Sequence, residues 1–589
     1  MKDFLKYTLA TVTGLVITSL ILFFIGALCV VGITSSSESE TTVKSNSIMM
    51  LDLNGVLSER SLDRPWEKIL GDGSTSIGLN DIIASIKKAK DNKDIKGIYI
   101  QATSLNGSFA SYQEIRDALL DFKKSGKFIV AYSDIYTQGL YYLSSVADKV
   151  LLNPQGSIEW RGLATAITYY KGLLDKLGVE MQVFKVGTYK SAVEPFTSTS
   201  MSAANRLQMS EMLNSLWGKM VNDVAKSRKL TPDTLNAFAN NLTTAFYPAE
   251  QSVKCKLADT LIYKENVRDY LKKMLRLKKD DNLNVLGLSE MINVKRNVPK
   301  DKSGDIIAVY YASGEIVDKS SSYSSEGIVL DDVVEDLNDL KDDDDVKAVV
   351  LRVNSPGGSA FASEQIWHAI QELKAKKPVV VSMGDYAASG GYYISCGASK
   401  IVAEPTTLTG SIGIFGMFPN TAKLMNKVGL TYDVVKTNKL SDIGISSRAM
   451  SDEEKSLFQM MIANGYNTFV TRCANGRHMS KTAIENIAEG RVWTGDKAVK
   501  LGLVDQLGNL DKAIDIAVQL SKVKGHSVIA YPKQESFFSL LLKEKPDNYI
   551  ESRILKSKLG SYYEAFNLIR SLDNKATIQA RIPYFINIH

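Results

Sequence analysis

The chain has 589 residues, of which 44% are hydrophobic and 23% are charged. These proportions are those of an ordinary globular protein and argue against long disordered or low-complexity regions. The formal net charge is only +6, and the basic residues are spread along the chain rather than gathered in one stripe. A nucleic-acid-binding protein is therefore not expected, and the length predicts roughly three to four domains or one duplicated large domain.

The first predicted element is a charge-free run from Tyr7 to Ile33. At about 1.5 Å per helical residue, this run exceeds the roughly 20 residues that span a bilayer. A cleaved signal peptide would have an apolar region of about 7 to 15 residues that ends in small residues, which fits this run poorly. Lipoprotein processing at Cys29 would need a small residue where Leu28 stands. We therefore predict an uncleaved transmembrane anchor over residues 7–33.

Charges beside the anchor predict its orientation. They are Lys2 and Lys6 before the run, and Glu38 and Glu40 after it. The positive-inside rule then places residues 1–6 in the cytoplasm and exports everything after Ser35. Residues 34–47 are rich in Ser, Thr and Glu, which predicts a solvated tether between the anchor and the fold.

Beyond the tether, the sequence repeats itself at a nearly constant offset. The segment IKGIYIQATSLNGSFASYQEI from Ile95 parallels VKAVVLRVNSPGGSAFASEQI from Val346, and 346 − 95 = 251. Two further pairs keep this offset: YSDIYTQGLYYL from Tyr132 with MGDYAASGGYYI from Met383, and LGVEMQVFKVG from Leu177 with VGLTYDVVKTN from Val428. After a short local insertion, GSIEWRG from Gly156 also matches GSIGIFG from Gly410. The chain is therefore one fold written twice.

Each half alternates short β-branched runs, such as residues 98–101 and 349–353, with amphipathic helical stretches such as residues 362–376. This alternation predicts βαβ units with parallel strands, and hence an α/β fold. A longer helix is predicted over residues 451–476. The boundaries that we assign are an N-terminal repeat at 48–296, a polar linker at 297–305, a C-terminal repeat at 306–535 and a C-terminal extension at 536–589.

The C-terminal extension ends in the segment IQARIPYFINI. This segment is apolar enough to pack against the fold or to form an edge strand. A second membrane anchor is not expected, because no run in the extension approaches spanning length.

The cysteines and histidines argue against a metal centre or a redox site. They are Cys29, Cys255, Cys396 and Cys473, and His368, His478, His526 and His589. The cysteines form no CxxC pair, and the histidines form no HExxH motif. No metal and no cofactor are predicted.

Two glycine-rich turns in the second half predict acyl-transfer chemistry. SPGG at residues 355–358 ends a predicted strand and leads into a helix, and ASGG places Ser389 at the start of the next helix. Backbone N–H groups at a helix start are unpaired, so the amides of Gly358 and Gly390 are candidates for an oxyanion hole beside a serine nucleophile. Such turns also occur as plain structural features, but the two together favour catalysis.

Comparison of the halves supports this interpretation. The position equivalent to Ser389 is Gln138, since 389 − 251 = 138, and the position equivalent to Gly357 is Asn106, since 357 − 251 = 106. The first half therefore keeps the scaffold and lacks both the serine and the paired glycines.

A serine nucleophile needs a base, and histidine is the usual one. His368 lies on the predicted helix after SPGG, where we assign it to the helix surface or to packing. A lysine can act as the base if burial or a neighbouring cation keeps its amine neutral. Spacing alone does not single out one lysine of this chain.

Four motifs resemble the long, tandem-repeat form of the signal peptide peptidase A family: NSPGGS from Asn354, GDYAASGGYY from Gly384, TGSIGIFG from Thr409 and VWTGDKAVKLGLVDQLG from Val492. The resemblance extends from the anchor to about Ala517. It implies two crotonase/Clp-protease-like repeats behind one transmembrane helix, and a serine peptidase with a lysine base.

The resemblance also implies which lysine acts. In this family the base lies in a GxYKSAxEPF segment of the first repeat, which here is GTYKSAVEPF and contains Lys190. The repeat register agrees with a lysine from the first half and a serine from the second. The position equivalent to Lys190 in the second half is 190 + 251 = 441, which is a serine. Ser411 in TGSIG is a candidate to hold the Lys190 amine by a hydrogen bond, and a turn-capping role is the alternative.

The implied activity is amide hydrolysis through an acyl-enzyme, with cleaved signal peptides and other unfolded apolar peptides as substrates. The resemblance further implies a homotetramer at the bacterial inner membrane, with its catalytic region on the periplasmic side. Two alternatives stay open. A crotonase-like acyl-CoA enzyme would share the fold and the oxyanion glycines, and a catalytically inactive membrane-anchored scaffold could retain the duplicated fold.

Overall fold

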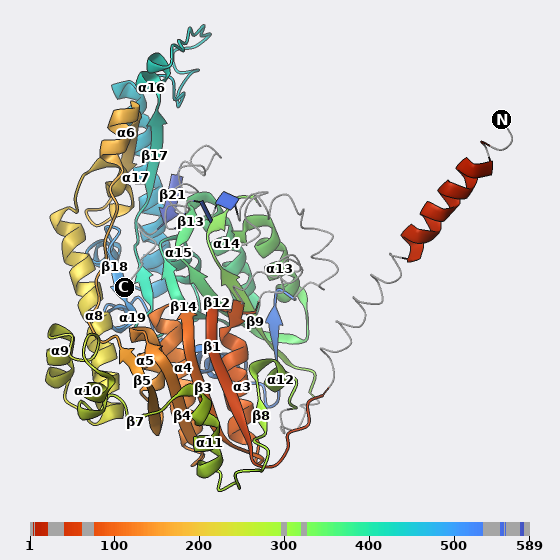
Figure 1. Cartoon of the computed structure of the whole chain (residues 1–589). Helices are drawn as coiled ribbons and strands as arrows, with labels where there is room; N and C mark the ends of the chain where they lie inside the picture. The colour runs from red at the N-terminus through yellow and green to blue at the C-terminus, as the bar shows by residue number, and fades with distance from the viewer. Residues whose placement is uncertain are drawn as a thin grey trace.

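The computed structural model describes residues 4, 6–21, 40–61, 76–295, 303–319, 327–533, five positions between 554 and 560, and 578–581 (Figure 1). Residues 6–21 form a helix. Among the described residues, no helix is both long and apolar enough to cross a membrane. Residues 22–33 of the predicted anchor, residues 34–39 of the tether, most of the linker and most of the C-terminal extension lie outside the described residues.

The first sheet is parallel throughout and is built from the first half of the chain, in the order β2-β1-β3-β4-β5-β7 with β8 also paired to β1. Its strands are β1 (Ser47–Ser58), β2 (Ser76–Gly78), β3 (Ile95–Asn106), β4 (Phe128–Tyr136), β5 (Lys149–Ile158), β7 (Thr260–Leu261) and β8 (Val285–Leu286). The central strands are buried, as expected for a parallel sheet with helices on its faces.

The second sheet comes from the second half, in the order β18-β16-β14-β12-β9-β20, with β15 paired to β14 and β19 paired to β15. Its strands are β9 (Ile306–Ser313), β12 (Val346–Ser355), β14 (Val379–Ala388), β15 (Lys400–Ala403), β16 (Leu408–Gly410), β18 (Val492–Thr494), β19 (Gln506–Leu507) and β20 (Ser527–Tyr531). The β16–β18 pair is antiparallel, and the other pairs are parallel.

The third sheet joins the two halves. Its order is β11-β10-β13-β21-β17-β6, and its strands are β6 (Glu180–Lys185), β10 (Ile316–Val317), β11 (Ile328–Val329), β13 (Gly357–Ser359), β17 (Phe415–Asn420) and β21 (Ile578–Arg581). Strand β6 of the first half runs antiparallel to β17 of the second half, from Lys185 opposite Phe415 to Glu180 opposite Asn420. The chain that follows β6 is thereby carried into the second half.

Helices surround the sheets. In the first half they are α3 (Leu79–Asp91), α4 (Phe109–Lys123), α5 (Gln138–Ser144), α6 (Lys171–Leu177), α7 (Glu194–Thr197), α8 (Ala203–Arg228), α9 (Pro232–Asn240), α10 (Ala249–Lys254), α11 (Lys264–Met274) and α12 (Leu288–Ile292), with a 3₁₀ turn at Ser191–Val193. In the second half they are α13 (Leu330–Asp342), α14 (Ala360–Lys376), α15 (Gly390–Ser395), α16 (Ala422–Lys427), α17 (Asp452–Arg477), α18 (Lys481–Glu485), α19 (Gly495–Lys500) and α20 (Leu510–Ser521).

The predicted α/β class and the tandem repeat are confirmed. Helices α3 and α13 are each 13 residues long and start at positions 79 and 330, which differ by 251. Helices α8 and α17 are each 26 residues long, and both start after a serine cap, Ser202 or Ser451, whose side chain accepts a backbone N–H. Such caps satisfy N–H groups that the first helical turn leaves unpaired, so the equivalent serines start equivalent helices.

One matched pair of sequence blocks differs in structure. Residues 180–185 form β6, whereas the equivalent residues 431–436 form no strand and are exposed. The difference follows from pairing, because β6 has β17 beside it and residues 431–436 have no strand beside them within the described chain. An extended segment without a partner gains no ladder hydrogen bonds.

A buried ion cluster also connects the halves. Arg352 of β12 donates to Glu59 at 2.8 and 3.1 Å and to Glu114 of α4 at 2.6 Å, and all three side chains are at most 6% exposed. Burial raises the pKa of Glu114 to about 7, opposed by Arg352 and reinforced by Glu59. Burial likewise raises the pKa of the nearby Glu404 well above its ordinary value. The Arg352 guanidinium is therefore the positive charge that stabilises several buried carboxyl groups.

We expect the free energy of unfolding to fall as pH rises from about 4.5 to about 7, because folded Glu114 holds its proton over a range in which the unfolded chain releases it. The total effect of this one group is roughly 3 kcal/mol. Glu114→Gln should flatten that slope, as measured by urea unfolding at several pH values. The exposed Glu335→Gln serves as the control, and an unchanged slope in Glu114→Gln would refute the assignment.

Candidate active site

Ser389 stands between β14 and α15 in a strained backbone conformation, with φ +56° and ψ −113°, and is fully buried. A positive φ is unusual for a residue with a side chain and persists where the surroundings enforce it. Here the amide of Ser389 donates to the carbonyl of Gly410 at 2.8 Å, and β14 pairs with β16 beside it. The sharp strand-to-helix turn therefore fixes the position of the hydroxyl.

The two glycine turns predicted to supply oxyanion donors pack directly against each other. A Cβ added to Gly357 would lie 2.8 Å from the amide nitrogen of Gly390, and one added to Gly390 would lie 3.1 Å from the Cα of Gly357. Gly358, in an extended conformation, would place a Cβ 2.0 Å from the carbonyl oxygen of Ile316. No side chain fits at these three positions, so glycine is what allows the two turns to approach each other.

Lys190 reaches this place from the other half of the chain. Its side chain is fully buried, and its Nζ lies 2.7 Å from the Oγ of Ser389. Nζ also donates to Ser411, at 3.0 Å to Oγ and 3.2 Å to the carbonyl oxygen. Burial lowers the pKa of Lys190 well below its ordinary value, and no carboxylate oxygen in the described chain is a hydrogen-bond partner of Nζ. The arrangement favours a neutral amine.

The path of the chain after β6 explains how Lys190 gets there. The β6–β17 pair ends at Lys185 and Phe415, and the amide of Tyr189 then donates to the carbonyl of Glu489 at 2.9 Å. The next residue, Lys190, lies against Gly490, where an added Cβ would stand 2.6 Å from the Lys190 Cβ. Gly490 therefore makes room for the lysine, a role that the sequence analysis missed.

Ser411 also has a positive φ, +50°, and its amide donates to the carbonyl of Arg491 at 2.7 Å. Its hydroxyl accepts from Lys190, as one of the two alternatives for this residue requires. The structure thus brings Ser389, Lys190 and Ser411 into one hydrogen-bonded group, with the glycine turns beside the serine. His368 lies exposed on α14 and takes no part in this group.

The equivalent place in the first half is closed. The side chain of Gln138 accepts from the amides of Arg161 and Gly162, each at 3.0 Å, and donates to the carbonyl of Gly162 at 3.1 Å. Ser441, the counterpart of Lys190, is exposed and donates to the carbonyl of Asn438 at 2.7 Å. In the first half the turn therefore holds the side chain of Gln138, which is bonded to the backbone. In the second half the same position holds the hydroxyl of Ser389, which contacts Lys190.

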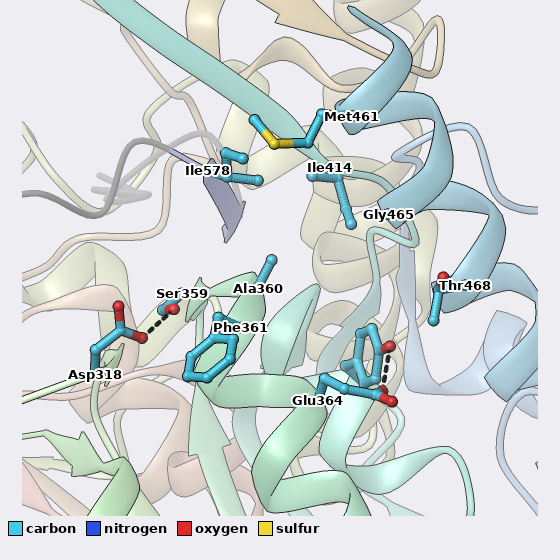
Figure 2. Close-up of a pocket in the computed structure, with 11 residues that line it drawn as sticks. Asp318, Ser359, Ala360, Phe361, Glu364, Ile414, Met461, Gly465, Thr468 and Ile578 are labelled. Carbon is cyan, nitrogen blue, oxygen red and sulfur yellow. Dashed lines mark hydrogen bonds between the residues drawn. The ribbon is translucent and has the colours of Figure 1, made fainter. Parts of the chain in front are cut away.

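Figure 2 shows a cavity of about 360 Å³ lined by residues that neighbour the glycine turn at Gly358 and the loop at Gly413. Its lining includes Ser359, next to Gly358, and Ile414, next to Gly413. Phe361 and Met461 contribute apolar surface from α14 and α17, and the Tyr393 hydroxyl donates to Glu364 at 2.6 Å on its floor. A mostly apolar pocket of this kind is suited to bind an apolar side chain.

Two segments of the chain, residues 121–278 and 371–524, match the model of peptidase family S49, and residues 311–408 match that of Clp protease. The repeated fold and these matches define a serine peptidase. The chain belongs to peptidase family S49, and the resemblance to signal peptide peptidase A is confirmed.

Three relatives illustrate this membership. The chain is 37% identical over 553 residues to "Protease 4" of Salmonella typhi, covering 91% of this chain and 88% of the relative. It is 31% identical over 485 residues to "Serine protease SPPA, chloroplastic" of Arabidopsis thaliana, covering 82% and 70%. A "Putative signal peptide peptidase SppA" of Enterococcus faecium is 35% identical over 230 residues, covering 38% and 67%.

Gly490→Ala should lower kcat about 10²-fold, because its Cβ would collide with Lys190 and displace the amine by a fraction of an ångström or more. Gly490 has φ +77°, so part of any effect is backbone strain. Gly429→Ala is the matched control, since Gly429 has φ +80° and an added Cβ would meet nothing within 4 Å. Equal kcat for both variants in a peptide hydrolysis assay would contradict a positioning role for Gly490.

Proposed function

We propose that this serine peptidase is an endopeptidase whose nucleophile is Ser389 and whose general base is Lys190. The observation that carries the proposal is the 2.7 Å contact between Lys190 Nζ and Ser389 Oγ, in a place where burial favours the neutral amine. A neutral amine within hydrogen-bond reach of a hydroxyl can remove its proton. Ser411 holds the amine in line from the other side.

The reaction has two stages. Ser389 Oγ attacks the scissile carbonyl while its proton moves to Lys190, and the amides of Gly358 and Gly390 hold the oxyanion. Lys190 then protonates the leaving amine, and an acyl ester remains on Ser389. In the second stage water replaces the amine, Lys190 takes a proton from that water, and the acid is released with Ser389 restored.

Neither alternative accounts for this site as well. An acyl-CoA enzyme of the same fold has no need for a buried lysine against a serine. An inactive scaffold has no need to keep a buried amine unpaired with any carboxylate, which costs free energy that an apolar residue would not. The retained Ser389–Lys190 contact therefore supports catalysis.

The proposed substrates are cleaved signal peptides and other unfolded apolar peptides. The apolar cavity beside the site and the name of the Enterococcus faecium relative support this substrate class. The charge-free run of residues 7–33 supports a single-pass anchor, with the catalytic region on the periplasmic side of the bacterial inner membrane. Such an anchor would place the site where signal peptides are released.

Removal of either dyad member should abolish hydrolysis of a fluorogenic peptide with an apolar P1 residue. For the detergent-solubilised protein we expect Ser389→Ala and Lys190→Met to lower kcat/KM by about 10³-fold or more. Methionine keeps most of the volume of the lysine stem, so the fold should survive. Near-normal activity in Lys190→Met would refute the base assignment, and activity in Ser389→Ala would refute the nucleophile.

The same wild-type assay has a pH signature. Because the reaction needs neutral Lys190, kcat/KM should fall as pH drops through the lowered pKa of that lysine and should level off above it. The plateau should begin well below the pH at which an ordinary exposed lysine loses its proton. Activity that keeps rising up to that higher pH would mean that the base is not desolvated.

We also propose the homotetramer, formed through two segments that form no strand within one chain although their counterparts in the other half do. Residues 428–435 expose several apolar side chains, and Val435 is 99% exposed. The repeat makes residues 431–436 the counterpart of β6, since 180 + 251 = 431. After the local insertion the offset is 410 − 156 = 254, so residues 161–166 are the counterpart of β17, which begins at residue 415. The latter segment also forms no strand.

Strand β6 already pairs with β17 inside one chain, so the two counterparts can pair in the same way between chains. One chain would offer residues 431–436 to residues 161–166 of the next. An interface that joins two different surfaces is heterologous, and copies of it form a ring when the rotation between neighbours closes, which the proposed tetramer does after four chains. Because the proposed contact is a pairing of strands, the assembly does not require a heptad pattern in the sequence.

The register of the β6–β17 pair predicts the contact. Met417 lies opposite Val183, which transfers to Leu163 opposite Val434 of the neighbouring chain. Because paired strands bring Cα atoms within disulfide range, Leu163→Cys with Val434→Cys should form cross-linked oligomers on mild oxidation. Non-reducing electrophoresis measures this. Leu163→Cys with Ile443→Cys is the out-of-register control, and equal cross-linking of the two pairs would contradict the proposed pairing.

A further inference from the structure

The C-terminal strand β21 lies inside the third sheet rather than at an edge or on its surface (Figure 1). It pairs antiparallel with β13 on one side, with Ala580 opposite Gly358, and antiparallel with β17 on the other, with Gln579 opposite Phe415. The sequence analysis expected packing or an edge strand at this segment. The extension instead fills the space between two strands that flank the candidate active site.

Strands β13 and β17 frame a groove that fits an extended peptide. An extended ligand that adds to an open strand gains main-chain hydrogen bonds, which is a recurring way to bind peptides. Strand β21 makes this contact on both sides at once, and it extends over four residues. It therefore occupies the position that a peptide substrate needs.

The carbonyl oxygen of Ala580 lies at the glycine turns. A Cβ added to Gly357 would stand 2.0 Å from this oxygen, and one added to Gly390 would stand 3.2 Å from it. Gly390 directly follows Ser389, and Gly358 is the register partner of Ala580. Ala580 thus presents its carbonyl where the oxyanion of the proposed reaction would form.

The side chains of β21 fit the surroundings as those of a bound peptide would. Ala580 is fully buried, and Ile578, two residues earlier on the same strand face, lines the cavity shown in Figure 2. On the other side of the carbonyl, Arg581 pairs with Glu315 at 2.9 Å. A small side chain therefore lies at the carbonyl, and a larger apolar one forms part of the cavity wall.

We propose that the chain cleaves itself between Ala580 and Arg581, with residues 578–580 as the acyl side of an intrachain substrate. This inference rests on the proposed function. The Ser389 Oγ bond to the Ala580 carbonyl carbon forms, the bond from that carbon to the Arg581 nitrogen breaks, and the Ser389 proton passes through Lys190 to the new Arg581 amine. Water then hydrolyses the ester and leaves the Ala580 carboxylate and free Ser389. The released peptide is residues 581–589.

Intact-mass spectrometry of the purified full-length chain tests this proposal. Wild-type protein should end at Ala580, whereas Ser389→Ala and Lys190→Met should keep residues 581–589. Ala580→Trp should also keep residues 581–589, because the site of the fully buried Ala580 methyl group has no room for an indole. The same substitution should lower KM for an added peptide, because the strand no longer fits between β13 and β17. Ala580→Gly, which adds no volume, is the matched control and should be cleaved.

The added fluorogenic peptide separates this proposal from the proposed function. A wild-type chain that hydrolyses the peptide but keeps residues 581–589 would overturn self-cleavage alone, while loss of both reactions would overturn the proposed function as well. Isotope-labelled Ser389→Ala chains mixed with unlabelled wild type test whether the reaction stays within one chain. Labelled chains should remain intact, and their cleavage would overturn the intrachain assignment.

Discussion

The contact between Lys190 and Ser389 depends on the pairing of β6 with β17, and the candidate site depends on that contact. The two residues are 199 positions apart and belong to different halves of the chain. A lysine amine is stable in a buried place only if its surroundings accept it in neutral form or supply opposite charge. Here two hydroxyls and a carbonyl surround the Lys190 amine, and its burial at this place lowers its pKa.

Duplication allowed each half to give up part of the site. The first half retains β3, β4 and the turn into α5, but Gln138 bridges that turn to the loop at Arg161 and Gly162. The side-chain amide of Gln138 makes three hydrogen bonds to the backbone, which stabilise the turn in the first half. The second half keeps the glycine turns and the serine but takes its amine from the first. Neither half holds a complete site, and the buried cluster around Arg352 helps keep the two together.

Much of the fold and part of the site were predictable because their signals are local. The alternation of runs predicted the α/β class, and the offset of 251 predicted two copies of one fold, in which the structure has helices of equal length such as α3 and α13. The glycine turns and Ser389 lie in contiguous motifs, so their backbone geometry follows from the residues themselves. Lys190 required the family resemblance, because nothing near it in the sequence reveals the strand pairing that buries it.

The features that the sequence did not predict are set by long-range contacts. Gly490 matters because its missing side chain makes room for Lys190, and 490 − 190 = 300 residues separate them. Residues 431–436 resemble β6 in sequence, but a strand also needs a partner, and the described chain supplies none for them. The same rule explains β21, which is too short to be stable alone and forms because β13 and β17 pair with it on both sides.

The position of β21 also bears on which peptides the enzyme admits. A tethered strand competes with free substrate at an effective concentration on the order of millimolar, so it is a strong competitor even when its own contacts are modest. A substrate must therefore offer an extended main chain on both sides and an apolar side chain for the pocket that Ile578 lines. Folded proteins cannot present such a segment without unfolding, whereas short apolar peptides can. The competition between β21 and substrate thus favours the unfolded apolar peptides proposed above over the surface loops of intact proteins.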